Sequence, residues 1–125
     1  MPETEGTKTT LVDIILAFLS SLAPNEWVPG MRSEPWGELL YGLKLGGWTE
    51  MGEANWDAHY PLFPDLFEAQ PAILRWCLVR WDGSLCIHPE KRRPIPPDLA
   101  EKVQAMTTLA RKIPGFFDQP AAVPP

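Results

Sequence analysis

Two cysteines and a histidine lie in a segment whose pattern predicts a β-hairpin. Residues 72–89 are rich in strand-forming side chains and contain an Asp-Gly pair at 82–83, a preferred two-residue turn. The register set by this turn places Cys77, Cys86 and His88 on one face of the hairpin. Cross-strand neighbours on one face lie about 5 Å apart and diagonal ones about 7 to 8 Å, so these side chains form the sharpest candidate for chemistry.

Thiolate and imidazole groups are zinc ligands, and His59 or Asp57 offers a fourth. The same atoms allow a thiol nucleophile, since the imidazole of His88 could take the proton of Cys77 or Cys86. The paired-cysteine spacing typical of zinc sites is absent, and neither cysteine is placed beside an oxyanion-stabilising helix N-terminus. A small enzyme or zinc-binding protein is therefore the alternative interpretation, and we expect neither a bound metal nor another cofactor.

A second group combines Asp57 and His59 with the aromatic residues Trp56 and Tyr60. An Asp/His pair can perform acid–base work, but turn capping by Asp57 and a surface position for His59 explain the pattern more simply. The sequence contains no glycine-rich phosphate loop, Gly-x-Ser-x-Gly, His-Glu-x-x-His or dinucleotide motif. These observations predict a protein without a catalytic centre.

Charge and tryptophan content indicate a different role. The 125 residues carry 11 basic and 16 acidic side chains, a net charge of −5, with six tryptophans and fifteen prolines. The acidic residues concentrate between 34 and 68 and the basic ones between 75 and 93. The basic run at 91–93 suits a solvated connector, or else contact with RNA, DNA or an acidic protein. Because phosphate binding depends on Lys and Arg, direct nucleic-acid binding is not expected.

Tryptophan and tyrosine are over-represented at protein interfaces, and an acidic surface attracts a basic one. We therefore expect a non-catalytic protein-binding module, acting as a modulator, inhibitor or immunity-type partner of a protein with a basic surface. The residues expected to contact that partner are Trp27, Trp36, Glu38, Trp48, Glu50, Glu53, Trp56, Asp57 and Tyr60.

Helical spacing of apolar residues predicts the elements that hold these side chains. Helices are expected over 10–23, 34–44 and 98–113, and one or two helical turns over 65–69. The first is apolar nearly all round, which predicts burial on two sides or a homodimer interface. Additional strands, if present, are expected at 27–28 or 46–50.

The expected fold class is α+β, with two amphipathic helices packed on a small antiparallel sheet built around the 72–89 hairpin. The middle of the chain is expected to be a long irregular segment rich in Pro, Gly and Trp. Residues 9–117 should form a single domain between flexible tails at 1–8 and 118–125. The apolar run at 11–23 is too short to span a membrane and lacks a positive flank, so a cytoplasmic protein with reduced thiols is expected.

Overall fold

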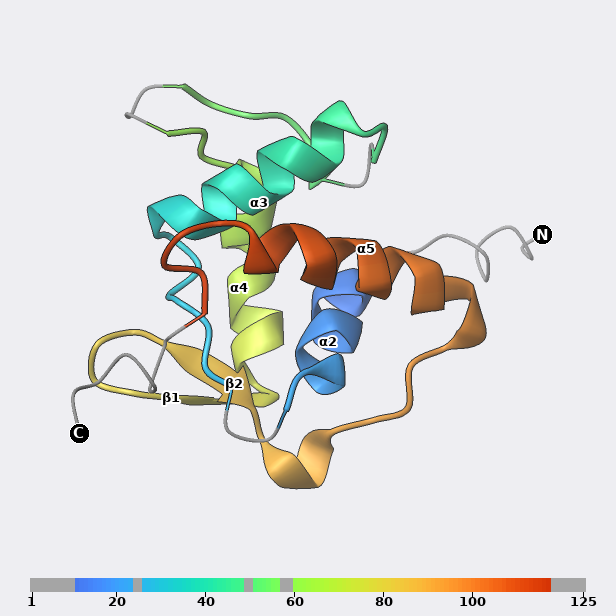
Figure 1. Ribbon diagram of the computed structural model, residues 1–125. Coiled ribbons are helices and arrows are strands. Elements are labelled where there is room, and N and C mark those ends of the chain that lie inside the picture. The colour runs from blue at the N-terminus through green and yellow to red at the C-terminus, as the bar shows by residue number, and fades with distance from the viewer. Residues whose placement is uncertain (1–10, 24–25, 49–50, 57–59, 118–125) are drawn as a thin grey trace.

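The computed structural model describes residues 11–23, 26–48, 51–56 and 60–117. Its elements in chain order are α2 (Leu11–Ser21), α3 (Glu34–Leu45), α4 (Pro64–Leu74), β1 (Cys77–Val79), β2 (Leu85–Ile87), the 3-10 turns η2 (Pro89–Lys91) and η3 (Pro97–Leu99), and α5 (Ala100–Arg111). Figure 1 shows α3 and α5 crossing one end of α2 and α4, with the β-hairpin projecting at the other end. The expected α+β class is confirmed, with four α-helices among the described residues.

Helix α2 lies at the centre of the molecule. Every residue of the run 14–20 is buried, and α2 packs against α4, α5 and β2. Burial on more than one side explains why nearly every position of this helix is apolar, as the sequence pattern predicted. The apolar side chains that suggested a homodimer through residues 10–23 are therefore covered by the chain's own elements.

The C-terminal end of α2 is held by an arginine from the basic run at 91–93. The guanidinium of Arg92 donates to the backbone oxygen of Ser20 at 2.8 Å and to that of Leu22. The last carbonyl groups of a helix lack intrahelical partners and carry the negative end of its dipole, so a cation stabilises them. Arg92 thus fixes the helix end, whereas its neighbours Lys91 and Arg93 are exposed.

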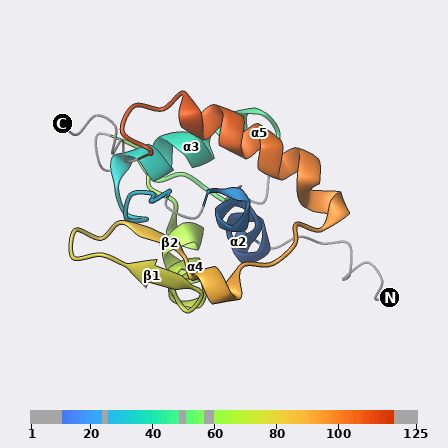
Figure 2. The ribbon, with the colours of Figure 1, turned by 60° about the horizontal axis from the view of Figure 1, so that its bottom comes forward.

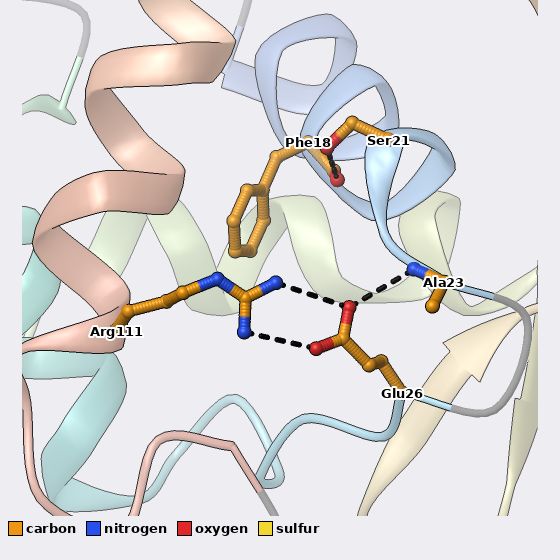
Figure 3. Close-up of polar contacts among 5 residues, drawn as sticks. All are labelled: Phe18, Ser21, Ala23, Glu26 and Arg111. Atoms are coloured by element: carbon orange, nitrogen blue, oxygen red, sulfur yellow. Dashed lines mark hydrogen bonds and ion pairs between the residues drawn. The ribbon is translucent and has the colours of Figure 1, made fainter.

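A second tie joins the segment after α2 to the end of α5 (Figure 3). The two guanidinium nitrogens of Arg111 donate to the carboxylate of Glu26 at 3.0 and 3.3 Å, and the N–H of Ala23 donates to the same group at 2.9 Å. Partial burial acts to raise the pKa of Glu26, but the bonds from Arg111 and Ala23 outweigh it and hold this pKa below its ordinary value. The ionised carboxylate is therefore the form that the fold favours.

Three rings from distant parts of the chain meet in the core. Phe18 of α2 contacts Trp36 of α3 and Phe116 in edge-on geometry, with ring centroids 6.1 and 6.0 Å apart. Trp36 and Phe116 lie 5.0 Å apart, and all three rings are fully buried. Such pairs favour edge-on or tilted contacts because the ring edge is positive and the face negative.

Helix α3 approaches the segment around Pro61 so closely that only glycine fits at position 37. A Cβ atom built on Gly37 would collide with the carbonyl oxygen of Pro61. The absence of a side chain therefore sets the position of α3, with Trp36 directed into the core and the next turns of the helix continuing over it.

Helix α4 is longer than the one or two turns predicted over 65–69. It runs for eleven residues and contains Pro71. Residues 73 and 74, predicted to begin a strand, belong to this helix instead, because Leu66 and Ile73 fall on the same face and are both buried. Burial of this face outweighs the strand propensity of residues 73–74 and the cost of a proline within a helix.

The hairpin differs from its predicted register by one residue. The observed pairs are Cys77 with Ile87, Leu78 with Cys86 and Val79 with Leu85. The loop has three residues, 81–83, and ends in the left-handed conformation at Gly83 (φ 91°). A three-residue loop closed by such a glycine is another common hairpin connection, so the same Asp-Gly pair serves a different turn.

A one-residue shift moves side chains to opposite faces of the strand pair. Cys77 and Cys86, predicted to share a face, therefore lie on different faces. On its other side β2 forms a bridge with Val28, through two hydrogen bonds of 2.9 Å between Val28 and Leu85. This bridge confirms a strand-like pairing at one of the two places where additional strands were expected.

Helix α5 starts at Ala100, two residues after the predicted start, because Asp98 lies in the preceding 3-10 turn and does not cap the helix. The proposed tails at 1–8 and 118–125 lie outside the described residues. Within the described segments, no helix is both long enough and apolar enough to cross a bilayer.

Candidate functional site

The outward face of α3 carries acidic and apolar side chains in line. Glu34, Glu38, Tyr41 and Leu45 follow one another at spacings of four, three and four residues, which places them on one side of a helix. Trp56 packs edge-on against Tyr41, with ring centroids 4.9 Å apart. We call these five residues the α3 surface.

The apolar part of the α3 surface is unusually open. Leu45 is 70% exposed and Trp56 is 55% exposed. Isolated exposed apolar residues are common, but here Leu45 lies one helical turn from the half-buried Tyr41, and Trp56 from the 51–56 segment packs on that same tyrosine. Tryptophan and tyrosine at such a patch supply large contact area with little loss of side-chain entropy on binding.

The acidic part of the α3 surface lies beside a cleft of about 290 Å³ lined by Glu34, Pro35, Glu38 and Pro114. Partial burial, a hydrogen bond with Glu34 and the charge of that neighbour raise the pKa of Glu38 above its ordinary value. Among the described residues, no basic side chain forms an ion pair with either carboxylate. A cation entering this cleft would relieve the repulsion between the two groups.

Trp36, predicted to contact a partner, is instead part of the core. Its side chain is fully buried against Phe18 and Phe116, and its indole N–H donates to the carbonyl oxygen of Pro29 at 2.7 Å. Trp36 shares the buried face of α3 with the leucines three, four and seven residues later, and this spacing was the signal for a core position.

Two further tryptophans of the predicted set lie beneath cations. The guanidinium of Arg80 stacks 4.3 Å from the ring centroid of Trp27, and the ammonium of Lys102 lies 5.1 Å from that of Trp48. Both indoles are half-buried, and Trp48 packs against the core. Cation–π contacts of this kind stabilise the fold, so these side chains have intramolecular partners.

The remaining predicted contact residues are divided between the surface and the undescribed segments. Trp56 and Glu53 are exposed, while Tyr60 is half-buried and its hydroxyl donates to a backbone oxygen at 3.2 Å. Glu50 and Asp57 lie outside the described residues. The structure therefore brings Trp56 together with Glu38 on the α3 surface, and adds three residues that the sequence reasoning missed: Glu34, Tyr41 and Leu45.

The cysteine–histidine group predicted on the hairpin is not assembled. Cys77 and Cys86 lie on opposite faces, and the thiol of Cys77 donates to the carbonyl oxygen of Ile73 at 3.4 Å. The Nδ1 atom of His88 accepts from the N–H of Glu90 at 3.2 Å. In the part of the chain that the structure describes, no three metal-binding side chains converge, and His59 lies outside it.

Both thiols are disfavoured as nucleophiles. Burial, reinforced by the charge of Cys86, raises the pKa of Cys77 to about 12. Burial also raises the pKa of Cys86, although Arg80 and Arg92 act in the opposite direction. A thiol with a raised pKa has very little thiolate at neutral pH, and the thiolate is the reactive form.

Comparisons of the chain with models of known protein families, with curated protein sequences and with solved structures find no match.

Proposed function

We propose that this protein is a non-catalytic protein-binding module that binds a partner with a basic surface through the α3 surface. One observation carries the proposal: Glu34 and Glu38, which form no ion pair with a basic side chain among the described residues, share one face of α3 with the exposed Leu45 and with Tyr41, on which the exposed Trp56 packs. Carboxylates alone are ordinary on a helix, but carboxylates in line with an exposed indole form a mixed surface suited to recognition.

The chemistry of this surface matches an arginine or lysine flanked by apolar residues. The cleft of about 290 Å³ between Glu34 and Glu38 can receive a guanidinium, which pairs well with carboxylates. The aliphatic stem of the same side chain, or a neighbouring apolar residue, would then cover Tyr41 and Trp56. Binding would also remove the repulsion that raises the pKa of Glu38.

Long-range charge supports the same partner. Residues 34–68 contain seven acidic side chains and one basic, a net of 1 − 7 = −6. A field of one sign accelerates the encounter with a partner of the other sign, and salt weakens this effect. A module that covers a basic site of its partner acts as a modulator, inhibitor or immunity-type protein. We place this activity in the cytoplasm, where the two free cysteines would stay reduced.

The proposal is tested with a basic peptide that contains alternating arginine and leucine residues, titrated into the full chain and followed by fluorescence anisotropy. Trp56→Ala and the double variant Glu34→Gln/Glu38→Gln should each weaken binding about tenfold, the loss of one interface anchor or a charged pair. Trp81→Ala and Glu101→Gln are the matched controls, since both residues are exposed but lie elsewhere.

Equal weakening by Glu101→Gln would show that the peptide responds to net charge, and equal weakening by Trp81→Ala would show that it binds any exposed indole; either result would refute the α3 surface as the site. Unchanged binding in the α3 variants would refute the proposed site. Circular dichroism at 222 nm checks that each variant retains its helices.

A further inference from the structure

A second exposed apolar area lies on the hairpin, away from the α3 surface. Trp81 at the loop is 96% exposed, and Val79 and Leu78 of β1 are 53% and 39% exposed. Figures 1 and 2 show the loop of the hairpin directed away from the helices. Exposed apolar side chains that gather on one element are typical of an interaction site, and tryptophan is over-represented at such sites.

Strand β1 is an open edge within the described residues. Its partner β2 is paired on both sides, with β1 and with Val28, whereas β1 pairs with β2 alone. The N–H of His88 donates to the carbonyl oxygen of Trp76 at 2.7 Å, and the N–H of Arg80 donates to that of Ser84 at 2.8 Å. The backbone groups of Trp76 and Arg80 therefore face the second strand of the hairpin. In an antiparallel pair the backbone N–H and C=O groups of alternate residues point away from the partner strand, so those of Cys77 and Val79 face outward.

A basic cleft adjoins the start of this edge. Arg75, Trp76 and Lys91 line a cleft of about 300 Å³, and the ammonium of Lys91 donates to the backbone oxygen of Arg75 at 2.9 Å. The guanidinium of Arg93 stacks 4.7 Å from the ring centroid of Trp76. Among the described residues, no carboxylate forms an ion pair with any of these three cations.

The hairpin loop is held rigidly enough to present Trp81. The carboxylate of Asp82 accepts from the hydroxyl of Ser84 at 2.6 Å and from its N–H at 2.9 Å, and these bonds lower the pKa of Asp82. Arg80 in turn donates to the same hydroxyl at 2.8 Å while stacking on Trp27. A preformed loop loses little entropy when a ligand binds.

We propose that the outer edge of β1 binds an extended acidic polypeptide by strand addition, with its carboxylates on the basic cleft and its apolar side chains against Val79 and Trp81. The backbone groups of Cys77 and Val79 would pair with the added strand, whose alternate side chains then reach the two kinds of surface. This binding site goes beyond the α3 surface, because its elements and the charge of its partner are different.

A polypeptide fits better than a nucleic acid. The outward backbone groups of residues 77 and 79 repeat every two residues, about 7 Å along a strand, which is the repeat of another β-strand. A phosphate backbone offers acceptors but no N–H donors for the outward carbonyl groups.

The test uses the full chain and a fluorescein-labelled seven-residue peptide of alternating glutamate and valine, followed by anisotropy. The second probe is the same peptide with N-methyl groups on alternate backbone amides. It keeps the charge and the side chains but loses the peptide N–H donors that would pair with Cys77 and Val79. We expect the first peptide to bind and the methylated one to bind at least tenfold more weakly. Equal binding of the two peptides would overturn strand addition.

Variants of the chain locate the site. Val79→Pro removes an outward N–H at the edge of the sheet, a position where proline is tolerated. This variant should weaken binding of the acidic peptide about tenfold, whereas the control Val79→Ala should weaken it less than threefold. Arg75→Gln/Lys91→Gln should also weaken it about tenfold, while Trp56→Ala should leave it unchanged.

Two results would assign the edge to a different occupant and overturn the proposal. The first is tighter binding of a twelve-residue oligothymidine than of the acidic peptide, with the same sensitivity to Arg75→Gln/Lys91→Gln. The second is a dimer of the chain alone, seen by sedimentation, that Val79→Pro dissociates. Because the basic peptide that tests the α3 surface is a separate probe, failure here leaves that proposal standing.

Discussion

The α3 surface and the hairpin edge both expose large apolar side chains, but they offer a partner different parts of the chain. On α3 the backbone hydrogen bonds are used within the helix, so recognition depends on side chains at helical spacing, from Glu38 to Leu45. On β1 the backbone itself is available at Cys77 and Val79, and the side chains around it add charge and area. The first surface should therefore be selective for side chains, and the second more tolerant of the sequence that it pairs with.

The largest expected effect separates the two faces of α3. Trp36→Ala should lower the free energy of unfolding by about 3 to 5 kcal/mol, because it leaves a cavity among Phe18 and Phe116. Trp56→Ala, on the exposed face, should lower it by less than about 1 kcal/mol. Urea unfolding followed by circular dichroism measures both, and similar losses would show that Trp56 is a core residue and not a contact residue.

The second prediction acts on the hairpin alone. Gly83 has φ 91° with no neighbouring atom within 4 Å of an added Cβ, so Gly83→Ala introduces backbone strain without a collision. We expect a loss of about 1 kcal/mol in stability and weaker binding of the acidic peptide. Binding of the basic peptide to the α3 surface should be unaffected. Gly47→Ala, also at positive φ with open space around it, is the matched control and should leave the acidic peptide bound.

The smallest effect is expected from the ion pair between Glu26 and Arg111, which belongs to neither surface. Glu26→Gln should lower stability at pH 7 by up to about 1 kcal/mol, since both side chains are partly exposed to solvent. The folded-state pKa of Glu26 is lowered, so its contribution is complete above the unfolded value near 4.5 and is lost as the pH falls through the folded value.

Urea titrations of the two proteins at pH 7 and at pH 3 measure this contribution. The difference in unfolding free energy between the original chain and Glu26→Gln should shrink at pH 3. A difference that grew on acidification would contradict the assigned direction of the pKa shift. Neither peptide should respond to the substitution at pH 7.

The helices predicted from apolar spacing were found because their buried faces are long and regular. Helix α2 has a buried residue at almost every position, and α3 and α5 keep one apolar stripe each. Helix α4 was shortened in prediction because its strand-forming residues Ile73 and Leu74 and its internal Pro71 oppose a helix locally. Packing of α4 against α2 makes these residues helical, and a contact between distant segments is not visible in a single stretch of sequence.

The candidate site was only partly predictable for two physical reasons. Trp36 lies on the leucine-bearing face of α3, yet tryptophan suits both cores and interfaces, and composition does not separate the two. The hairpin register was predicted wrongly because an Asp-Gly pair serves both two-residue and three-residue loops, and the shift of one residue places Cys77 and Cys86 on opposite faces. Glu38 and Trp56, both predicted to contact a partner, are exposed, because neither falls on the buried face of a helix; their contact with a partner stays a prediction.

The central position of α2 has a consequence for biosynthesis. The ribosome delivers this apolar helix well before two of the residues that enclose it, Arg92 and Phe116. Until then the eight apolar residues of α2 stay accessible to chaperones and to neighbouring nascent chains. Messages that stop before residue 100 would therefore release sticky products, and translation speed should influence the yield of native protein more than in a fold whose centre is made late.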